Sequence, residues 1–204
     1  LSGCSQKTAE ELVLDAQQKI AAGQKSAGVI ELKTALQKAP NNAQARFLLG
    51  KMYIERGAAK AAEKELERAL KLGYEKNEVL PLLASAYNLQ FKNQEIIDLV
   101  SESKNIDPTV ETSLLLYQAL AYFQLDKAVK AKQSIVQANE LSAESVYSKL
   151  GSAYLAFSNS QLNDSLAKTD EILALQPELT EALLLKGQLA TLNKNYPLAV
   201  ESFE

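Results

Sequence analysis

The stretch that decides the fold is residues 43–73, which read AQARFLLGKMYIERGAAKAAEKELERALKLG. Apolar residues recur in it at the i, i+3, i+4 and i+7 spacing of a helix with one buried stripe, first as far as Tyr53 and again from Ala62. The two patterns meet near Gly57, and Gly50 and Ala62 are small enough for two helices to cross closely there. The stretch therefore predicts a helical hairpin, which needs similar hairpins beside it to cover its apolar face.

Small residues repeat along the chain at a fixed interval, because Ala16, Gly50 and Ala84 follow one another every 34 residues, and Gly28 and Ala62 share that spacing. A 34-residue period of helical hairpins is typical of the tetratricopeptide repeat (TPR), which this chain resembles from Thr8 onward. The resemblance implies an all-α fold, a right-handed α-solenoid of about six tandem hairpins with the last one truncated. The predicted repeats, after a tether over residues 1–7, are residues 8–42, 43–76, 77–110, 111–143, 144–179 and 180–204.

The later repeats depart slightly from this period. Repeat four slips by one residue and places Ala119 at the small position. In repeat five we align Gly151 and Tyr154 with the pattern, which puts two extra residues into its turn at residues 158–160. The chain ends at Glu204, within the last predicted helix and without a polar capping repeat, so we expect a longer array.

Helix ends are marked by capping residues. Thr8 with Glu11 has the form of a capping box, so the first helix should begin beside it. Asn42 is a favourable N-cap, and Gly73 can end a helix in the left-handed conformation. Pro81 is tolerated only in a first helical turn, which predicts that its helix starts late.

The composition excludes several functions. The 22 basic and 25 acidic residues leave a net charge of −3 without a basic stripe, so no nucleic acid partner is expected. There is no histidine, which removes Ser–His and Cys–His pairs and the usual zinc sites, and the single cysteine cannot form an intrachain disulfide. We therefore expect no catalytic residues, metal or cofactor. No apolar run is long enough to span a bilayer as a helix.

A tyrosine recurs at one helical position of several repeats, at Tyr53, Tyr87, Tyr122 and Tyr154. These rings could stack on a ligand, but the repeat period by itself favours packing between neighbouring helices.

In TPR proteins the first helix of each repeat lines a concave groove, which is the expected binding site for protein or peptide segments. Its apolar members could contact an extended or helical partner, or could pack within the superhelix. The predicted groove consists of Val13, Gln17, Phe47, Lys51, Ser85, Asn88, Leu116, Leu120, Phe123, Ser152, Leu155, Leu184 and Gln188.

The first four residues, Leu1-Ser2-Gly3-Cys4, resemble the bacterial lipobox. The resemblance implies cleavage before Cys4, a lipid on Cys4, and attachment to a membrane of the bacterial cell envelope with the repeats facing the periplasm. The alternative is a chance tetrapeptide with a free thiol.

The segment IELKTALQKAPNNAQARFLLGK, residues 30–51, precedes a repeat that closes in ALKLGY, residues 69–74. Together with the lipobox it resembles the TPR-repeat lipoprotein of the PEP-CTERM/exosortase system. That resemblance implies a non-catalytic envelope scaffold that supports exopolysaccharide production or export, or exosortase-linked protein sorting. Two alternatives stay open: an assembly lipoprotein for outer-membrane proteins or pili, and the targeting arm of a larger enzyme.

Overall fold

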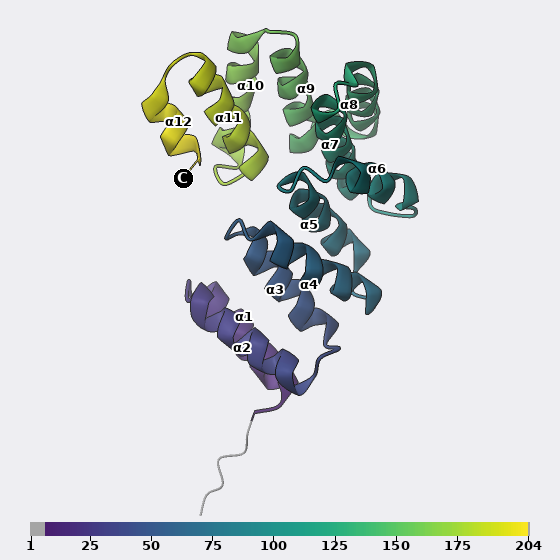
Figure 1. Ribbon diagram of the computed structural model, residues 1–204, viewed down its shortest axis with the longest axis vertical. Helices are drawn as coiled ribbons and strands as arrows, with labels where there is room; N and C mark the ends of the chain where they lie inside the picture. Colours follow the sequence, from purple (N-terminus) through teal and green to yellow (C-terminus); the bar gives the residue numbers. More distant parts are fainter. Residues whose placement is uncertain (1–6, 204) are drawn as a thin grey trace, which may run out of the picture. The chain divides into compact units, whose positions relative to one another are not determined.

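The computed structural model describes residues 7–203, and α-helices make up this part of the chain (Figure 1). Short turns join the helices in pairs, and no strand occurs among the described residues. The predicted all-α array of helical hairpins is confirmed. The twelve helices of residues 7–203 are α1 (Ala9–Ala21), α2 (Lys25–Lys38), α3 (Ala43–Ile54), α4 (Ala59–Lys71), α5 (Lys76–Asn88), α6 (Asn93–Glu102), α7 (Pro108–Gln124), α8 (Ala128–Ser142), α9 (Val146–Ser158), α10 (Leu162–Leu175), α11 (Thr180–Leu192) and α12 (Tyr196–Phe203).

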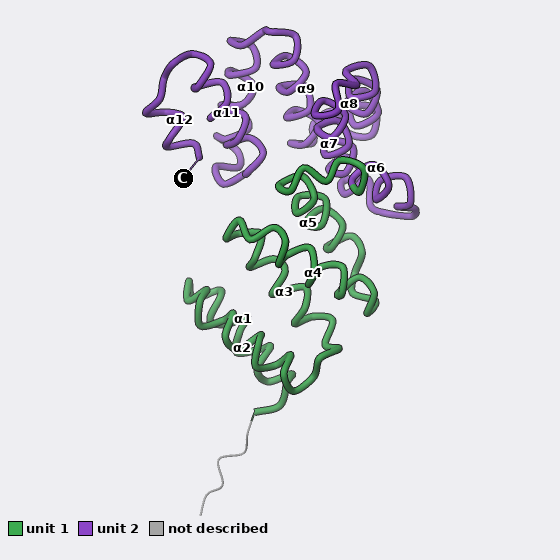
Figure 2. Tube along the Cα trace, in the orientation of Figure 1, with its two compact units in different colours: residues 1–95 green, residues 96–204 purple. Residues whose placement is uncertain are grey.

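The chain divides into two compact units, residues 1–95 and residues 96–204 (Figure 2). In unit 1, α1 packs against α2 and α3 against α4, while α2 contacts α3 and α4 contacts α5. In unit 2, the pairs α7–α8, α9–α10 and α11–α12 follow one another, and α8 and α10 each contact the next pair. The boundary between the units lies within α6. Each unit is therefore built by stacking a hairpin on its sequence neighbour.

The turn inside each of the six described hairpins contains one residue in the left-handed region of backbone conformation. These residues follow one another at intervals of 34 or 35, so the hairpins share one turn geometry even where the residue is not glycine. They are Gly23 (φ 77°), Gly57 (68°), Phe91 (58°), Asp126 (56°), Ser160 (61°) and Lys194 (59°).

The fifth hairpin has a register different from the predicted one. Ser160 holds the left-handed position 34 residues after its equivalent in the fourth hairpin, so the turn contains no extra residues. Its helices cross at Ala153, where the Ser165 hydroxyl donates to the Ala153 carbonyl at 2.9 Å. Gly151 instead faces Ile135 of α8, in the preceding hairpin. The predicted two-residue insertion is wrong. The small size of Gly151 serves a contact between two hairpins, and the crossing within the fifth hairpin lies at Ala153 instead.

Close crossings in unit 1 are confirmed at the small residues. A Cβ added at Gly50 would lie 2.7 Å from Leu66 Cγ, and one added at Gly28 would lie 2.6 Å from Ile20 Cγ1. Ala62 is fully buried at the same crossing as Gly50. These helices approach so closely that a methyl group would force a shift.

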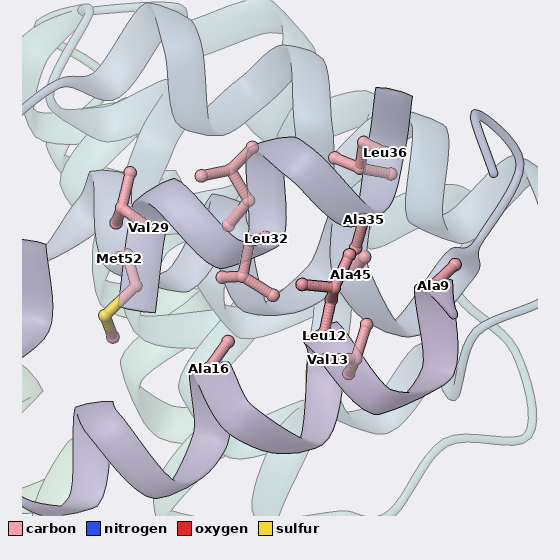
Figure 3. Packing of buried hydrophobic residues seen from close by; sticks show 11 residues of the cluster. Ala9, Leu12, Val13, Ala16, Val29, Leu32, Ala35, Leu36, Ala45 and Met52 are labelled. Atoms are coloured by element: carbon pink, nitrogen blue, oxygen red, sulfur yellow. The ribbon is translucent and has the colours of Figure 1, made fainter. Parts of the chain in front are cut away.

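The core of the first hairpins is one cluster of side chains from α1, α2 and α3 (Figure 3). Leu12 of α1, Leu32 of α2 and Leu49 of α3 are members, and Leu32 is fully buried. Burying one such leucine stabilises the fold by about 1.5–3 kcal/mol. The cluster crosses from the first hairpin into the second, so each hairpin covers the apolar face of its neighbour.

The predicted helix caps in unit 1 are confirmed. The Glu11 N–H donates to Thr8 Oγ1 at 3.2 Å, and the Thr8 N–H donates to Glu11 Oε2 at 2.7 Å. The Ala45 N–H donates to the side chain of Asn42 at 2.8 Å, and Gly73 follows α4 with φ 83°. These bonds satisfy backbone donors that a helix end leaves unpaired.

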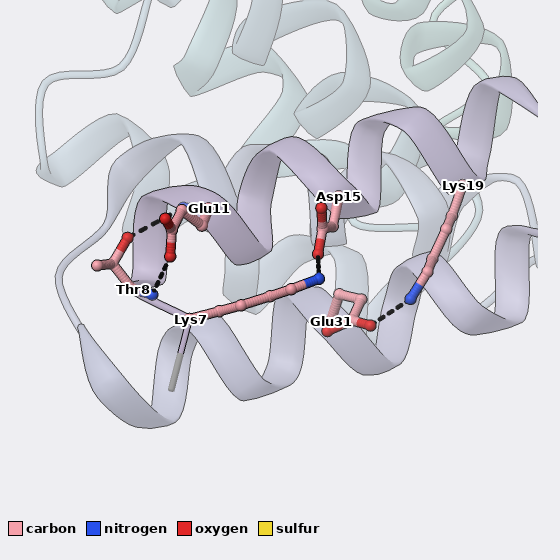
Figure 4. A network of polar contacts seen from close by, with 6 residues as sticks. All are labelled: Lys7, Thr8, Glu11, Asp15, Lys19 and Glu31. Atoms are coloured by element: carbon pink, nitrogen blue, oxygen red, sulfur yellow. Dashed lines mark hydrogen bonds and ion pairs between the residues drawn. The ribbon is translucent and has the colours of Figure 1, made fainter. Parts of the chain in front are cut away.

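Two ion pairs lie along α1, one that starts from Lys7 beside the first cap and one near the end of the helix (Figure 4). Lys7 pairs with Asp15, and Lys19 of α1 pairs with Glu31 of α2. Lys19 stands where the next three repeats carry tyrosine. The first hairpin therefore has a partly exposed ion pair at this position instead of a packed aromatic ring.

The helix that contains Pro81 does not start late, as predicted. It begins at Lys76, so Pro81 is its sixth residue. The helix continues past Pro81 to Asn88, because the packing of its buried residues outweighs the hydrogen bond that proline cannot donate. None of the helices within residues 7–203 has the length and apolar character needed to cross a membrane.

Candidate interaction faces on the first helices

The apolar groove residues predicted in unit 1 are packed inside the hairpins. Val13 is 2% exposed and belongs to the α1–α3 core cluster. Phe47 is 6% exposed, and its ring stacks on Tyr74 with centroids 4.4 Å apart and planes inclined by 18°. Packing within unit 1 therefore accounts for both side chains, and a partner could reach the Phe47 ring only if Tyr74 moved.

The polar groove residues of unit 1 differ in their exposure. Ser85 and Asn88 of α5 are buried, Gln17 of α1 is half-buried, and Lys51 of α3 is exposed. Lys51 is thus the member of this set that a partner could contact without any rearrangement.

In unit 2 the predicted groove passes from buried to exposed along the chain. Leu116 and Leu120 of α7 are 1% and 5% exposed, and Phe123 packs partly buried against the core between α7 and α8. On α11, Leu184 is half-buried and Gln188 is exposed. The most accessible part of the predicted groove in this unit is therefore on its last pair of helices.

The corrected register of the fifth hairpin changes its groove residues. Counting 34 residues from Leu120 leads to Tyr154, and a further 34 leads to Gln188, so Tyr154 holds the position assigned to Ser152. Ser152 lines a cavity beside α8 and α10, while Leu155 packs against the core between α7 and α8. The assignment of Ser152 and Leu155 to the groove rested on the wrong alignment of Gly151. The interval between the fourth and sixth repeats was the signal that locates Tyr154.

Three tyrosines surround the buried carboxylate of Glu181 in unit 2. Glu181 is 4% exposed, and the Tyr117 hydroxyl donates to its Oε1 at 2.7 Å. The Tyr154 hydroxyl donates to the Glu181 carbonyl oxygen at 2.9 Å. Burial, followed by the charge of Glu181, raises the pKa of both Tyr147 and Tyr154, so both phenols stay neutral at physiological pH. The cluster joins α7, α9 and α11.

The tyrosines of the second to fourth hairpins pack against neighbouring helices, as predicted. The Tyr87 hydroxyl donates to Glu67 Oε1 of α4 at 3.0 Å, and burial with that carboxylate raises the pKa of Tyr87. Lys33 of α2 lies 5.9 Å from the centre of the Tyr53 ring, and Tyr122 packs against the core between α7 and α8. These contacts leave no ladder of free rings for a ligand.

A cavity of about 260 Å³ opens between α8, α9 and α10. Ile172, Lys149 and Lys168 are among the residues that line it. Lys149 pairs with Glu144 at 2.9 Å, and Lys168 pairs with Asp164. Because both lysines have carboxylate partners, the cavity does not select strongly for an anion. It is also smaller than the ~300–1,000 Å³ of ordinary ligand sites.

Residues 20–86 match the family model described as "Tetratricopeptide repeat". This segment therefore contains tetratricopeptide repeats. The matched segment lies in unit 1 and runs from the end of α1 into α5. A comparison with curated proteins gives no match.

Several solved TPR structures are similar to the whole array. A thermophilic TPR protein of Thermus thermophilus is 19% identical with a TM-score of 0.63, covering 90% of this chain and 98% of that one. PilW, a type IV pilus biogenesis factor, is 15% identical with a TM-score of 0.63, covering 97% and 91%. YrrB, a TPR protein with an unusual peptide-binding site, is 14% identical with a TM-score of 0.61, covering 86% and 90%. At these identities the likeness shows the TPR fold.

The TPR hairpins bring together no metal site within residues 7–203, where no group of three or more acidic or cysteine side chains is suitably placed. Cys4, the predicted lipid attachment residue, lies outside the described part of the chain. The chemistry that the described surface offers is that of exposed and half-buried side chains on the first helices, which suits contact with another polypeptide.

Proposed function

We propose that the chain is a non-catalytic scaffold that binds protein or peptide segments along the first helices of its TPR hairpins. The observation that carries the proposal is that equivalent first-helix positions stay accessible in both units, at Lys51 in α3 and at Gln188 in α11. Leu184, one helical turn before Gln188, adds a half-buried apolar contact. This mixture of polar and apolar groups suits a partner segment better than it suits a small charged ligand.

A photocrosslinking amino acid placed at single positions tests this proposal. Positions 51 and 188 represent the first helices, and positions 60 and 132, which are exposed on α4 and α8, are matched controls on second helices. We expect the same crosslinked partner at positions 51 and 188 in cells, at several times the yield found at positions 60 and 132. Equal yields at all four positions would contradict binding through the first helices.

We also propose that a lipid on Cys4 holds the protein at a membrane of the bacterial cell envelope, with the repeats facing the periplasm. The lipobox-like Leu1-Ser2-Gly3-Cys4 supports this proposal, because the only cysteine of the sequence stands at its end. In the precursor protein, Cys4→Ala should move the protein from the membrane fraction to the soluble periplasmic fraction, while Ser5→Ala should leave it in place. Membrane attachment of the Cys4→Ala protein equal to that of wild type would contradict the anchor.

Within the envelope, we propose that the scaffold supports exopolysaccharide production or export, or exosortase-linked protein sorting. The support is the resemblance of residues 30–51 and 69–74 to the TPR-repeat lipoprotein of that system. Deletion of the gene should lower the amount of secreted polysaccharide or leave sorted proteins unprocessed, and the wild-type gene should restore both. Unchanged polysaccharide and unchanged sorting would contradict this role.

A second candidate is assembly of pili or outer-membrane proteins, and the structural similarity to PilW, a pilus biogenesis factor, supports the pilus part of it. The same deletion strain separates the two functions. Loss of surface pili or of outer-membrane proteins with normal polysaccharide would support the second candidate and contradict the first.

A further inference from the structure

The hydrogen bond between Tyr117 and Glu181 joins residues 64 positions apart, in the first helix of the fourth hairpin and the first helix of the sixth. The whole fifth hairpin, α9 and α10, lies between them in the chain. Other hydrogen bonds between helices of this unit join neighbours, such as the Tyr154 hydroxyl of α9 with the Glu181 carbonyl of α11. The Tyr117–Glu181 bond is thus a link that skips one repeat.

The surroundings of this bond favour a strong and fixed contact. Tyr117 and Glu181 are each 4% exposed, and the donor and acceptor oxygens are 2.7 Å apart. A hydroxyl that donates to a carboxylate away from water forms a shorter and stronger bond than a neutral pair does. The Tyr154 hydroxyl of the fifth hairpin makes a separate bond, to the backbone carbonyl of Glu181 and not to its carboxylate.

We infer that the Tyr117–Glu181 bond is a strap that fixes the distance between the fourth and sixth hairpins of unit 2. In a TPR array each repeat ordinarily contacts its neighbours alone, so small rotations at two successive interfaces add up between alternate repeats. A direct bond across the middle repeat removes this freedom. The strap also connects the two helices that carry the predicted groove residues Leu120 and Gln188, so it sets the separation of the two sides of that surface. This inference goes beyond the scaffold function and needs no bound partner.

The distance between two spin labels tests the strap directly. In the 204-residue chain with Cys4→Ser, labels at Glu111→Cys on α7 and Leu192→Cys on α11 lie at exposed positions of the two connected helices. We expect one narrow distance distribution in the otherwise unchanged chain. Tyr117→Phe, which removes the hydroxyl alone, should broaden the distribution and shift its mean, since the two interfaces beside the fifth hairpin can then move.

Two further variants separate the strap from ordinary stabilisation. Tyr154→Phe removes a bond of similar length between adjacent hairpins and should leave the distribution narrow. Tyr117→Phe combined with Glu181→Leu removes both polar partners without leaving either unpaired, and should broaden the distribution as the single Tyr117→Phe does. Circular dichroism checks that each variant keeps the helicity of the wild type.

An unchanged distribution in Tyr117→Phe and in the double variant would overturn the inference. So would equal broadening in Tyr154→Phe, or loss of helicity in both strap variants, because the pair would then support the fold in general and not the spacing of two hairpins. Since these measurements contain no partner, failure of the strap leaves the crosslinking test of the scaffold function unaffected.

Discussion

The two units of the chain hold similar hairpins together with different polar chemistry. In unit 1 the polar contacts between helices include ion pairs, such as that of Arg46 of α3 with Glu65 of α4, which is largely buried, and that of Lys92 with Glu63, which stays partly open to water. The side chain of Lys92 keeps 33% of its surface exposed. A partly exposed pair of this kind contributes little, about 0–1 kcal/mol, and depends on ionic strength. The crossings of unit 1 therefore depend on tight apolar packing.

Unit 2 instead places hydroxyl groups inside its helix contacts. The Ser148 hydroxyl of α9 donates to the Ala138 carbonyl of α8 at 3.0 Å, and Ser165 of α10 donates to Ala153 at 2.9 Å. Tyr117 reaches Glu181 in the same buried environment. A buried hydroxyl costs free energy unless it is hydrogen-bonded, so each of these bonds offsets the cost of burying its hydroxyl.

The TPR family model matches residues 20–86, which lie in unit 1, although the hairpin geometry continues through unit 2. A family model depends on residue types such as the Gly50 and Ala62 of one crossing. The hairpin itself depends on size and satisfied hydrogen bonds, which Ala153 and Ser165 also provide. Similar geometry is thus reached with residues that resemble the repeat pattern less.

The largest difference in stability should distinguish a glycine at a crossing within one hairpin from a glycine at a contact between two hairpins. Gly50→Ala should lower the free energy of unfolding by ~1–3 kcal/mol, because its Cβ would lie 2.7 Å from Leu66 Cγ at a crossing with no spare space. Gly151→Ala should change it by less than ~1 kcal/mol, because Ile135 Cγ1 lies at 3.3 Å and alanine favours the helix. Urea unfolding of both variants measures this contrast. An equal or larger loss for Gly151→Ala would place the fifth crossing at residue 151.

A smaller effect should show the contribution of the buried hydroxyls in unit 2. Ser165→Ala should destabilise the protein by ~0.5–1.5 kcal/mol, the usual net value of one hydrogen bond. Ser101→Ala is the matched control, since the Ser101 hydroxyl makes a similar bond to the Asp98 carbonyl on the exposed side of α6. The control should stay within ~0.5 kcal/mol of wild type. If Ser165→Ala lowered the free energy of unfolding by no more than the Ser101→Ala control does, the buried hydroxyls would not contribute to the packing of unit 2.

The sequence predicted the fold well and the site less well, for a physical reason. Small residues and caps act locally, so Gly50, Thr8 and Asn42 were interpreted correctly from spacing alone. Gly151 was misleading, because a small residue is needed wherever two backbones approach, whether within one hairpin or between two. The bond between Tyr117 and Glu181 could not be predicted, since no local pattern encodes a contact between alternate repeats.

The smallest effects should come from the turns, which have glycine at the left-handed position in the first two hairpins and another residue in the later four. Gly57→Ala in unit 1 should destabilise the protein by ~1 kcal/mol, because alanine disfavours φ 68°. Lys194→Gly in unit 2 should stabilise it by ~0.5 kcal/mol by relieving the same strain at φ 59°. Thermal unfolding of the two variants measures shifts of opposite sign. Destabilisation by Lys194→Gly would mean that the lysine side chain supports its turn.

Disulfide trapping tests the common hairpin register most directly, in the chain with Cys4→Ser. The pair Ala153→Cys and Ser165→Cys occupies the fifth crossing, and the pair Gly151→Cys and Ser165→Cys, two residues farther apart, would occupy it in the register of the inserted turn. We expect the first pair to form a disulfide in the folded protein under mild oxidation and the second to remain reduced, because only the crossing brings two Cβ atoms within the ~3.5–4.5 Å that a disulfide needs. Rapid disulfide formation by residues 151 and 165, with the pair at residues 153 and 165 staying reduced, would contradict the shared register of the six hairpins.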